Sequence, residues 1–261
     1  MNMHPYTSVA VDHLMKLVNI PSPTGFTHIA AEYLLDVLRG YGFTPYKTHK
    51  GNVVCEIGGE GHPLVVAAHV DTLGAMVRSI KPNGRLRFTA IGGYPANNVE
   101  NETCVVHTRD GRTYTGTFYL TTPASHVYKG IPDIKRDDTT IEVVLDENVS
   151  TKEDVRALGI EVGDFISLDP RAFNTPSGYI KSRHLDDKAS ASVLLALAKM
   201  VSAGDLTLSR KIYLVFTVHE EVGHGCAAGL PEDAEDILSV DMGCVGDDLG
   251  CDETMVSICP K

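Results

Sequence analysis

The hydrophobic pattern changes near residue 76 and changes back near residue 165, and this change constrains the fold more than any other feature of the sequence. On both sides of that stretch, helical and strand patterns alternate, as they do in α/β domains. Within it, short runs of β-forming residues are separated by turn residues such as Pro82-Asn83-Gly84 and Asp110-Gly111. The pattern therefore predicts an α/β domain, residues 1–75 and 166–261, interrupted by a β-rich domain, residues 76–165.

Periodicity and turn residues locate the individual elements. Apolar residues at helical spacing mark three amphipathic helices, and shorter apolar runs mark strands. Ser150 and Glu153 have the spacing of a capping box, which predicts a short helix near the end of the β-rich domain. The expected helices are 7–19, 26–39 and 187–202, and the expected strands are 52–57, 64–70, 85–91, 104–108, 113–120, 211–217 and 237–242.

Composition narrows the class of protein. Of the 261 residues, 43% are hydrophobic and 22% are charged, which is the balance of a globular domain. The formal net charge of −11 opposes binding to nucleic acid. No apolar run approaches the roughly 20 residues of a membrane span, and the N-terminal residues lack the pattern of a secretory signal. We therefore expect a soluble, cytoplasmic protein that binds neither nucleic acid nor membrane.

Two of the predicted strands end in side chains that can bind a metal ion or move a proton. His69 and Asp71 come directly after the apolar run Leu64–Ala68, and Asp241 follows the apolar residues of the last predicted strand. Open α/β sheets place their ligand sites at such strand ends. A structural interpretation stays open for each residue, because a strand-end His or Asp can simply bond nearby backbone groups.

Two pairs of adjacent acids lie at further element ends. Asp186-Asp187 comes at the start of the predicted helix 187–202, where a carboxylate can cap the helix or bridge two metal ions. Glu220-Glu221 follows the strand 211–217, and one of these acids can bind metal while the other acts as a general base. A solvated loop is the structural alternative for the second pair. Together, the His, Asp and Glu residues at four element ends suit a hydrolytic zinc or cobalt pair.

The order of these segments resembles the M42 family of metallo-aminopeptidases, which includes glutamyl and leucyl aminopeptidases and proteins once named endoglucanases. The resemblance covers essentially the whole chain. It is carried by His69-x-Asp71, Arg183-His184-Leu185-Asp186-Asp187-Lys188, His219-Glu220-Glu221-Val222-Gly223, Asp241 and the opening Ile20-Pro21-Ser22-Pro23-Thr24-Gly25.

This resemblance implies a three-layer α/β/α catalytic domain, as in zinc peptidases, interrupted by a small β-barrel-like domain. The inserted domain would build homo-oligomers, from dimers to tetrahedral dodecamers. Each subunit would hold two divalent metal ions, zinc or cobalt. Asp186 would bridge the two ions, and His69 and Asp241 would complete one site. Glu221 would bind the other metal.

The same resemblance implies an activity and two further roles. The protein would hydrolyse N-terminal residues from peptides. Glu220 would be the general base, and Asp71 would hold His69 in the tautomer that metal binding requires. His126 is interpreted as structural, and neither His184 nor His224 matches a ligand position of the family.

One histidine ligand implied by the resemblance has no counterpart here, because no histidine follows His224. We therefore expect the second metal site to be incomplete and the sequence to be a fragment of a longer protein. The alternatives are a catalytically incomplete subunit that keeps the assembly surface, and a related metal-dependent deacylase or carboxypeptidase. A glycoside hydrolase needs only two carboxylates, and His69 and the acid pair at Asp186 argue against it.

Overall fold

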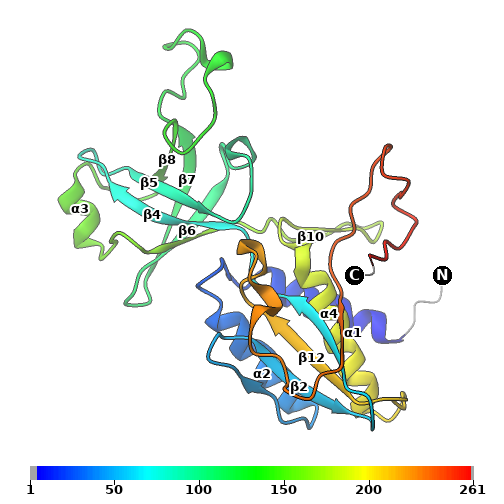
Figure 1. Cartoon of the computed structure of the whole chain (residues 1–261). Coiled ribbons are helices and arrows are strands. Elements are labelled where there is room, and N and C mark those ends of the chain that lie inside the picture. Colours follow the sequence, from blue (N-terminus) through cyan, green and yellow to red (C-terminus); the bar gives the residue numbers. More distant parts are fainter. Residues whose placement is uncertain (1–4, 260–261) are drawn as a thin grey trace.

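The computed structural model describes residues 5–259, which form an α/β domain and a β barrel lying side by side (Figure 1). The chain leaves the α/β domain after strand β3, Leu64–His69, and leaves the barrel after strand β9, Phe165–Leu168. The predicted α/β fold with an inserted β-barrel-like unit is confirmed.

A five-stranded sheet forms the centre of the α/β domain. Besides β3, its strands are β1, Tyr46–Lys47, β2, Val53–Gly58, β12, Ile212–Thr217, and β13, Asp236–Ser239. Their order is β1-β2-β12-β3-β13, with β3, β12 and β13 parallel. In this register Thr217, which ends β12, lies opposite His69, which ends β3. The carboxyl ends of neighbouring strands therefore meet at one edge of the sheet, where α/β folds place ligand sites.

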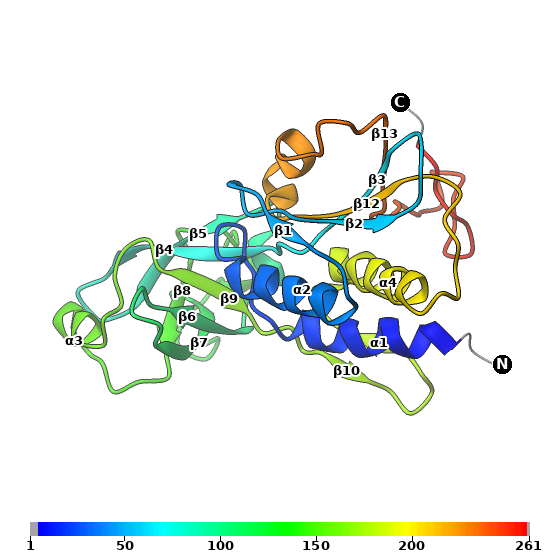
Figure 2. The same ribbon diagram turned by 90° about the horizontal axis from the view of Figure 1, so that it is seen from below.

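Helices α1, Pro5–Val18, α2, His28–Gly40, and α4, Leu185–Ser202, cover one face of this sheet (Figure 2). Their apolar stripes pack on β2, β3 and β12 to form the main core, in which Leu195 is fully buried. The segment between β12 and β13 packs on the opposite face, through residues such as Leu230. Within residues 5–259, none of the helices is both long and apolar enough to cross a membrane.

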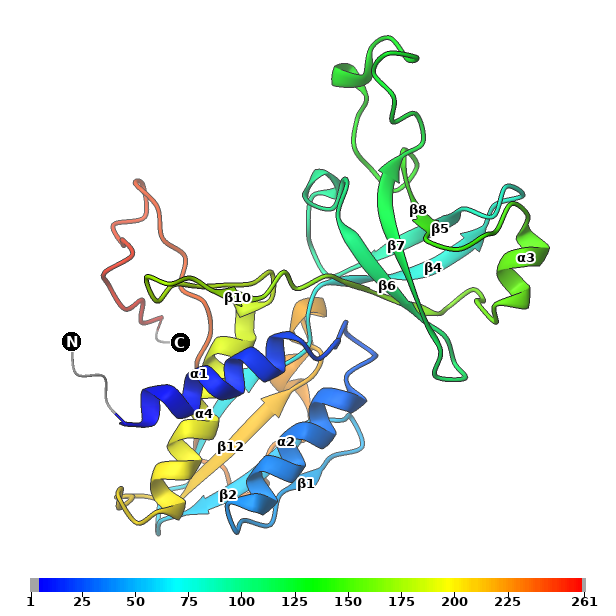
Figure 3. The same cartoon turned by 180° about the vertical axis from the view of Figure 1, so that it is seen from behind.

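Six strands close the barrel. They are β4, Gly74–Ile80, β5, Leu86–Ile91, β6, Thr103–His107, β7, Thr113–Leu120, β8, Ile141–Leu145, and β9. Around the barrel they follow the order β4-β5-β8-β7-β6-β9. Phe88 and Phe118 meet edge to face in its core, with ring centroids 4.9 Å apart. The loop between β7 and β8 projects away from the rest of the molecule (Figure 3).

Two local predictions are wrong. The capping box lies one residue later than predicted, at Thr151 and Asp154, where it starts the short helix α3, Lys152–Ala157. There the Thr151 hydroxyl accepts from the backbone N–H of Asp154, and the Asp154 carboxylate accepts from the backbone N–H of Thr151. The strand predicted at 237–242 is observed as the shorter β13, so Asp241 lies in the segment that follows it.

Leu195 and Val193 form a matched pair on α4, because Leu195 is fully buried whereas 55% of Val193 is exposed. Leu195→Ala leaves a cavity in the main core, so it should lower the free energy of unfolding by about 2–5 kcal/mol. Val193→Ala should change that free energy by less than about 1 kcal/mol, since alanine also favours the helix. Urea denaturation followed by circular dichroism measures both, and equal losses would contradict this packing.

Candidate active site

His69 occupies the end of β3 and has only 2% of its surface exposed. Its Nδ1 lies 2.9 Å from the backbone oxygen of Asp71, which can only accept a hydrogen bond, so Nδ1 carries a proton. Its Nε2 faces the carboxylate of Asp186, with 2.9 Å between Nε2 and Oδ1. Burial alone lowers the pKa of His69, but hydrogen bonds with Asp186 and Asp71 outweigh it and raise the pKa to about 11. A cation bound at Nε2 would displace the proton held there.

The buried carboxylate of Asp71 organises the residues around His69. It accepts a hydrogen bond of 2.6 Å from the Thr24 hydroxyl, in the loop between α1 and α2. It also accepts from the backbone N–H groups of Glu220 and Glu221, at 3.1 and 3.3 Å. Burial favours the neutral form, but His69 and Thr24 outweigh it and lower the pKa of Asp71. Asp71 therefore stays ionised and ties β3 to the turn that carries the two glutamates.

Carboxylates from three separate segments converge on the Nε2 side of His69. The distances from Nε2 are 2.9 Å to Asp186, 3.5 Å to Glu220 and 3.9 Å to Asp241. Two sets of side chains have ligand atoms within 4.8 Å of one another, and His69 belongs to both. One set adds Asp187 and Asp241, and the other adds Asp186 and Glu221. The two sets together contain every residue predicted to bind metal, although the predicted grouping of Asp186 with both His69 and Asp241 occurs in neither set.

Asp187 is a member of this cluster that the resemblance did not assign. Its Oδ2 accepts from the backbone N–H of His69 at 3.1 Å, and its buried Oδ1 has no hydrogen-bond partner among residues 5–259. Burial raises the pKa of Asp187 to about 7. His184 precedes α4 and makes no side-chain capping bond within residues 5–259, and Asp186 and Asp187 have non-helical backbone angles, so the regular helix begins only after the acid pair. In the sequence, the adjacent acids Asp186 and Asp187 indicate this second carboxylate.

The clustered acids repel one another, and a bound cation would neutralise this repulsion. Burial raises the pKa of Glu220 and raises that of Glu221 to about 7, and the charge of Asp186 adds to both shifts. Within residues 5–259, no lysine or arginine forms an ion pair with the clustered acids around His69. Imidazole nitrogen and carboxylate oxygen are ligands that zinc and similar divalent ions accept. These donors, with the orphaned oxygen of Asp187, fit a divalent metal ion.

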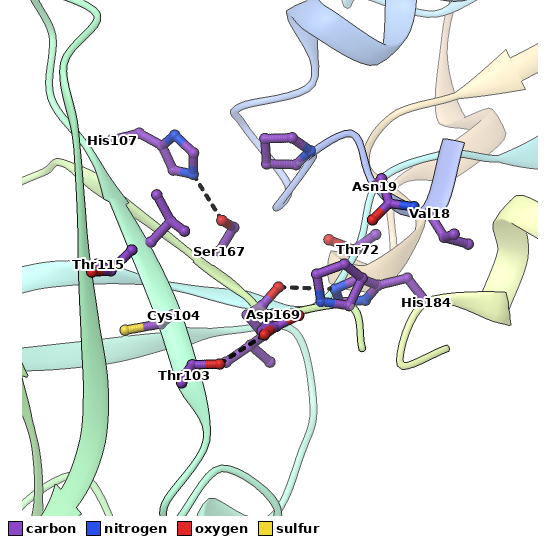
Figure 4. A pocket seen from close by; sticks show the side chains of 14 residues that line it. Val18, Asn19, Thr72, Thr103, Cys104, His107, Thr115, Ser167, Asp169 and His184 are labelled. Carbon is purple, nitrogen blue, oxygen red and sulfur yellow. Dashed lines mark hydrogen bonds between the residues drawn. The ribbon is translucent and has the colours of Figure 1, made fainter. Parts of the chain in front are cut away.

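The histidines that match no family ligand position lie outside this cluster. His184 lines a cavity of about 310 Å³ between the barrel and the loop that follows α1 (Figure 4). In the same cavity His107 Nε2 lies 2.7 Å from the Ser167 hydroxyl. Burial lowers the pKa of His184 to about 3 and that of His107 to about 4, so both rings are neutral at pH 7. His126 and His224 are exposed.

Comparison with known sequences identifies related proteins. Residues 51–260 match the family model described as M42 glutamyl aminopeptidase. The Bacillus subtilis (strain 168) protein named "Putative aminopeptidase YhfE" is 41% identical over 95% of this chain, and the match spans 72% of that protein. The Escherichia coli (strain K12) protein named "Putative aminopeptidase SgcX" is 29% identical over 80% of this chain. The chain spans 55% of that relative.

Comparison with solved structures also finds peptidases. Aminopeptidase APDkam598 from the archaeon Desulfurococcus kamchatkensis is 26% identical, with a TM-score of 0.80, and the match covers 95% of this chain and 67% of that one. The Pyrococcus horikoshii TET1 peptidase, whose title states that it can assemble into a tetrahedron or a large octahedral shell, has a TM-score of 0.76. It is 23% identical, and the match covers 89% of this chain and 68% of that one, so it shows the shared fold.

The neutral His107 makes stability depend on pH. Its pKa of about 4 lies below the value of about 6.5 in an unfolded chain, so the unfolded state binds more protons between these pH values. Stability therefore falls as the pH drops from about 6.5 to about 4. Going from pH 7 to pH 5 should cost the wild type roughly 2 kcal/mol more than His107→Gln. Urea unfolding at both pH values measures this, and parallel pH profiles would contradict it.

Proposed function

Because the chain belongs to the M42 glutamyl aminopeptidase family, a family of peptide-hydrolysing enzymes, we propose that it removes N-terminal residues from peptides with the help of divalent metal ions. One observation carries this proposal: carboxylates from three segments converge on the Nε2 side of a buried histidine. Such a cluster of like charges is costly unless a cation compensates it.

Two zinc or cobalt ions are the proposed cofactors. His69 and Asp241 would hold one ion, Glu221 would hold the other, and Asp186 would bridge them. Asp187, with its orphaned oxygen close to His69 and Asp241, is a further candidate ligand. When bound, the ions would supply a Lewis acid for the scissile carbonyl group and lower the pKa of a nearby water.

Glu220 is the proposed general base. Its side chain is 46% exposed, lies beside the cluster, and has a raised pKa because it is partly buried. A carboxylate with these properties can take a proton from the attacking water and deliver it to the leaving amine. Asp71 is the proposed positioning residue, because its backbone oxygen orients His69 and its carboxylate fixes the turn of Glu220 and Glu221.

The exposure of the cluster also accounts for the choice of the amino end of the substrate. The side chains of Asp186 and Asp241 are 56% and 35% exposed, so a peptide end can reach the bound metal ions. The free amine of a peptide N-terminus can bind a metal ion or a nearby acid, whereas an acetylated N-terminus offers no such amine. We further propose that the protein acts in the cytoplasm as a homo-oligomer, from a dimer to a tetrahedral dodecamer, and that the barrel contributes the assembly surface.

Replacing the shared histidine should abolish metal binding. His69 belongs to both sets of candidate ligands, so His69→Ala should reduce the bound zinc or cobalt to background. His126 is exposed and belongs to neither set of candidate ligands, so His126→Ala should keep the metal content of the wild type. Elemental analysis after dialysis against the metal measures both, and unchanged metal content in His69→Ala would refute the assignment.

Glu220→Gln should separate proton transfer from metal binding. Because the amide cannot accept the proton, kcat for an aminoacyl anilide should fall by roughly 100-fold or more while the metal content persists. The same assay on N-acetylated substrate should give no hydrolysis with wild type. Full activity in Glu220→Gln would exclude this residue as the base, and hydrolysis of the acetylated substrate would favour the deacylase alternative.

A further inference from the structure

A basic groove lies beside the start of α4. Its volume is about 580 Å³, and its walls come from the barrel, the segment after β9 and the residues just before α4. Three cations line it, Arg171, Lys181 and Arg183, together with one acid, Glu102. The groove therefore has a surplus of positive charge in a chain whose formal net charge is −11.

Glu102 offsets only part of this charge. Its two oxygens lie 3.3 Å from Arg171 and 3.1 Å from Arg183, so one carboxylate is shared by two guanidinium groups. Arg183 also donates to the backbone oxygen of Asn98 at 3.2 Å, and its Nε is buried without a hydrogen-bond partner in the described part of the chain. Lys181 lies over the ring of Phe173 and forms no ion pair among residues 5–259. The exposed ammonium group of Lys181 and the one arginine charge that Glu102 does not neutralise are therefore available to an additional anion.

Two links place this groove next to the acid cluster. Leu185 lines the groove and is followed at once by Asp186, which contacts His69. The loop after β5 passes so close to the cluster that a Cβ on Gly92 would lie 3.3 Å from the Glu221 backbone oxygen. Six residues further along the same loop, Asn98 lines the groove. In two views the hairpin of β10, Phe173–Asn174, also lies near the start of α4 (Figures 1 and 3).

We propose that this groove binds a carboxylate on the leaving side of the peptide substrate. An extended peptide advances about 3.3–3.6 Å per residue, so a carboxylate one or two residues beyond the scissile bond can reach a groove that begins beside Asp186. The amino end of the peptide then lies at the proposed metal site, and Arg171, Lys181 and Arg183 receive the carboxylate. This inference rests on the proposed aminopeptidase function, and it makes short peptides, or peptides with an acidic residue after the scissile bond, the preferred substrates.

Matched peptides test the inference with the metal-loaded protein. Trialanine and its C-terminal amide differ only in the terminal carboxylate, and Ala-Glu-Ala amide and Ala-Gln-Ala amide differ only in a side-chain carboxylate. We expect the acid of at least one pair to be cleaved with a kcat/KM about tenfold higher than its neutral partner. The pair that shows the difference identifies the source of the carboxylate.

Two variants connect this preference to the groove. Lys181→Gln and Arg171→Gln should each bring the acid-to-neutral ratio of kcat/KM toward one, and Lys181 is exposed, so its replacement should not disturb folding. Arg156→Gln removes the same charge from an exposed site on α3 and should keep the wild-type ratio. The ratio should also fall with added salt, because salt screens exposed charges.

The outcomes separate the two proposals. Equal cleavage within both peptide pairs, or a ratio that survives Lys181→Gln and Arg171→Gln, would overturn the groove while leaving the aminopeptidase intact. Absence of hydrolysis of all four peptides and of aminoacyl anilides would refute the proposed function itself. A ratio that falls equally in Arg156→Gln would show a general effect of net charge and would also overturn the groove.

Discussion

Repulsion among the carboxylates gathered around His69 is the constraint on which the site depends. Asp186, Glu220 and Asp241 lie within 3.9 Å of one imidazole nitrogen. Asp187 is fully buried and Glu221 is half-buried, and this burial raises the pKa of each to about 7. The surrounding structure must therefore hold these acids together against their mutual repulsion. The parallel strands β3 and β12 do so, because their ends meet at one edge of the sheet.

Much of this arrangement could be predicted from the sequence because it follows strand ends. His69 comes directly after the apolar run of β3, and Glu220 and Glu221 lie in the turn shortly after β12, so their convergence is a consequence of parallel pairing. The sequence indicates Asp187 only as half of an acid pair, because its position depends on non-helical backbone angles at the start of α4. The bond from Thr24 to Asp71 joins residues far apart in sequence, and no local pattern indicates it.

The inserted barrel contributes to the site as well as forming a separate core. Its loop after β5 approaches Glu221 closely at Gly92, where a side chain would also collide with Leu73. Glu102, near the end of that loop, pairs with Arg171 and Arg183 on the segment that leads back to α4. The barrel thus helps to shape both the acid cluster and the basic groove beside it. A peptide that carries a carboxylate shortly after its scissile bond is the kind of ligand that the charge of the groove favours.

Anomalous diffraction from crystals grown with zinc or cobalt tests the central claim most directly. The account predicts an anomalous peak about 2.1 Å from the Nε2 atom of His69, with carboxylate oxygens of the acid cluster completing its coordination. A peak only at distant surface residues, or none at His69 in protein that hydrolyses peptides, would contradict it.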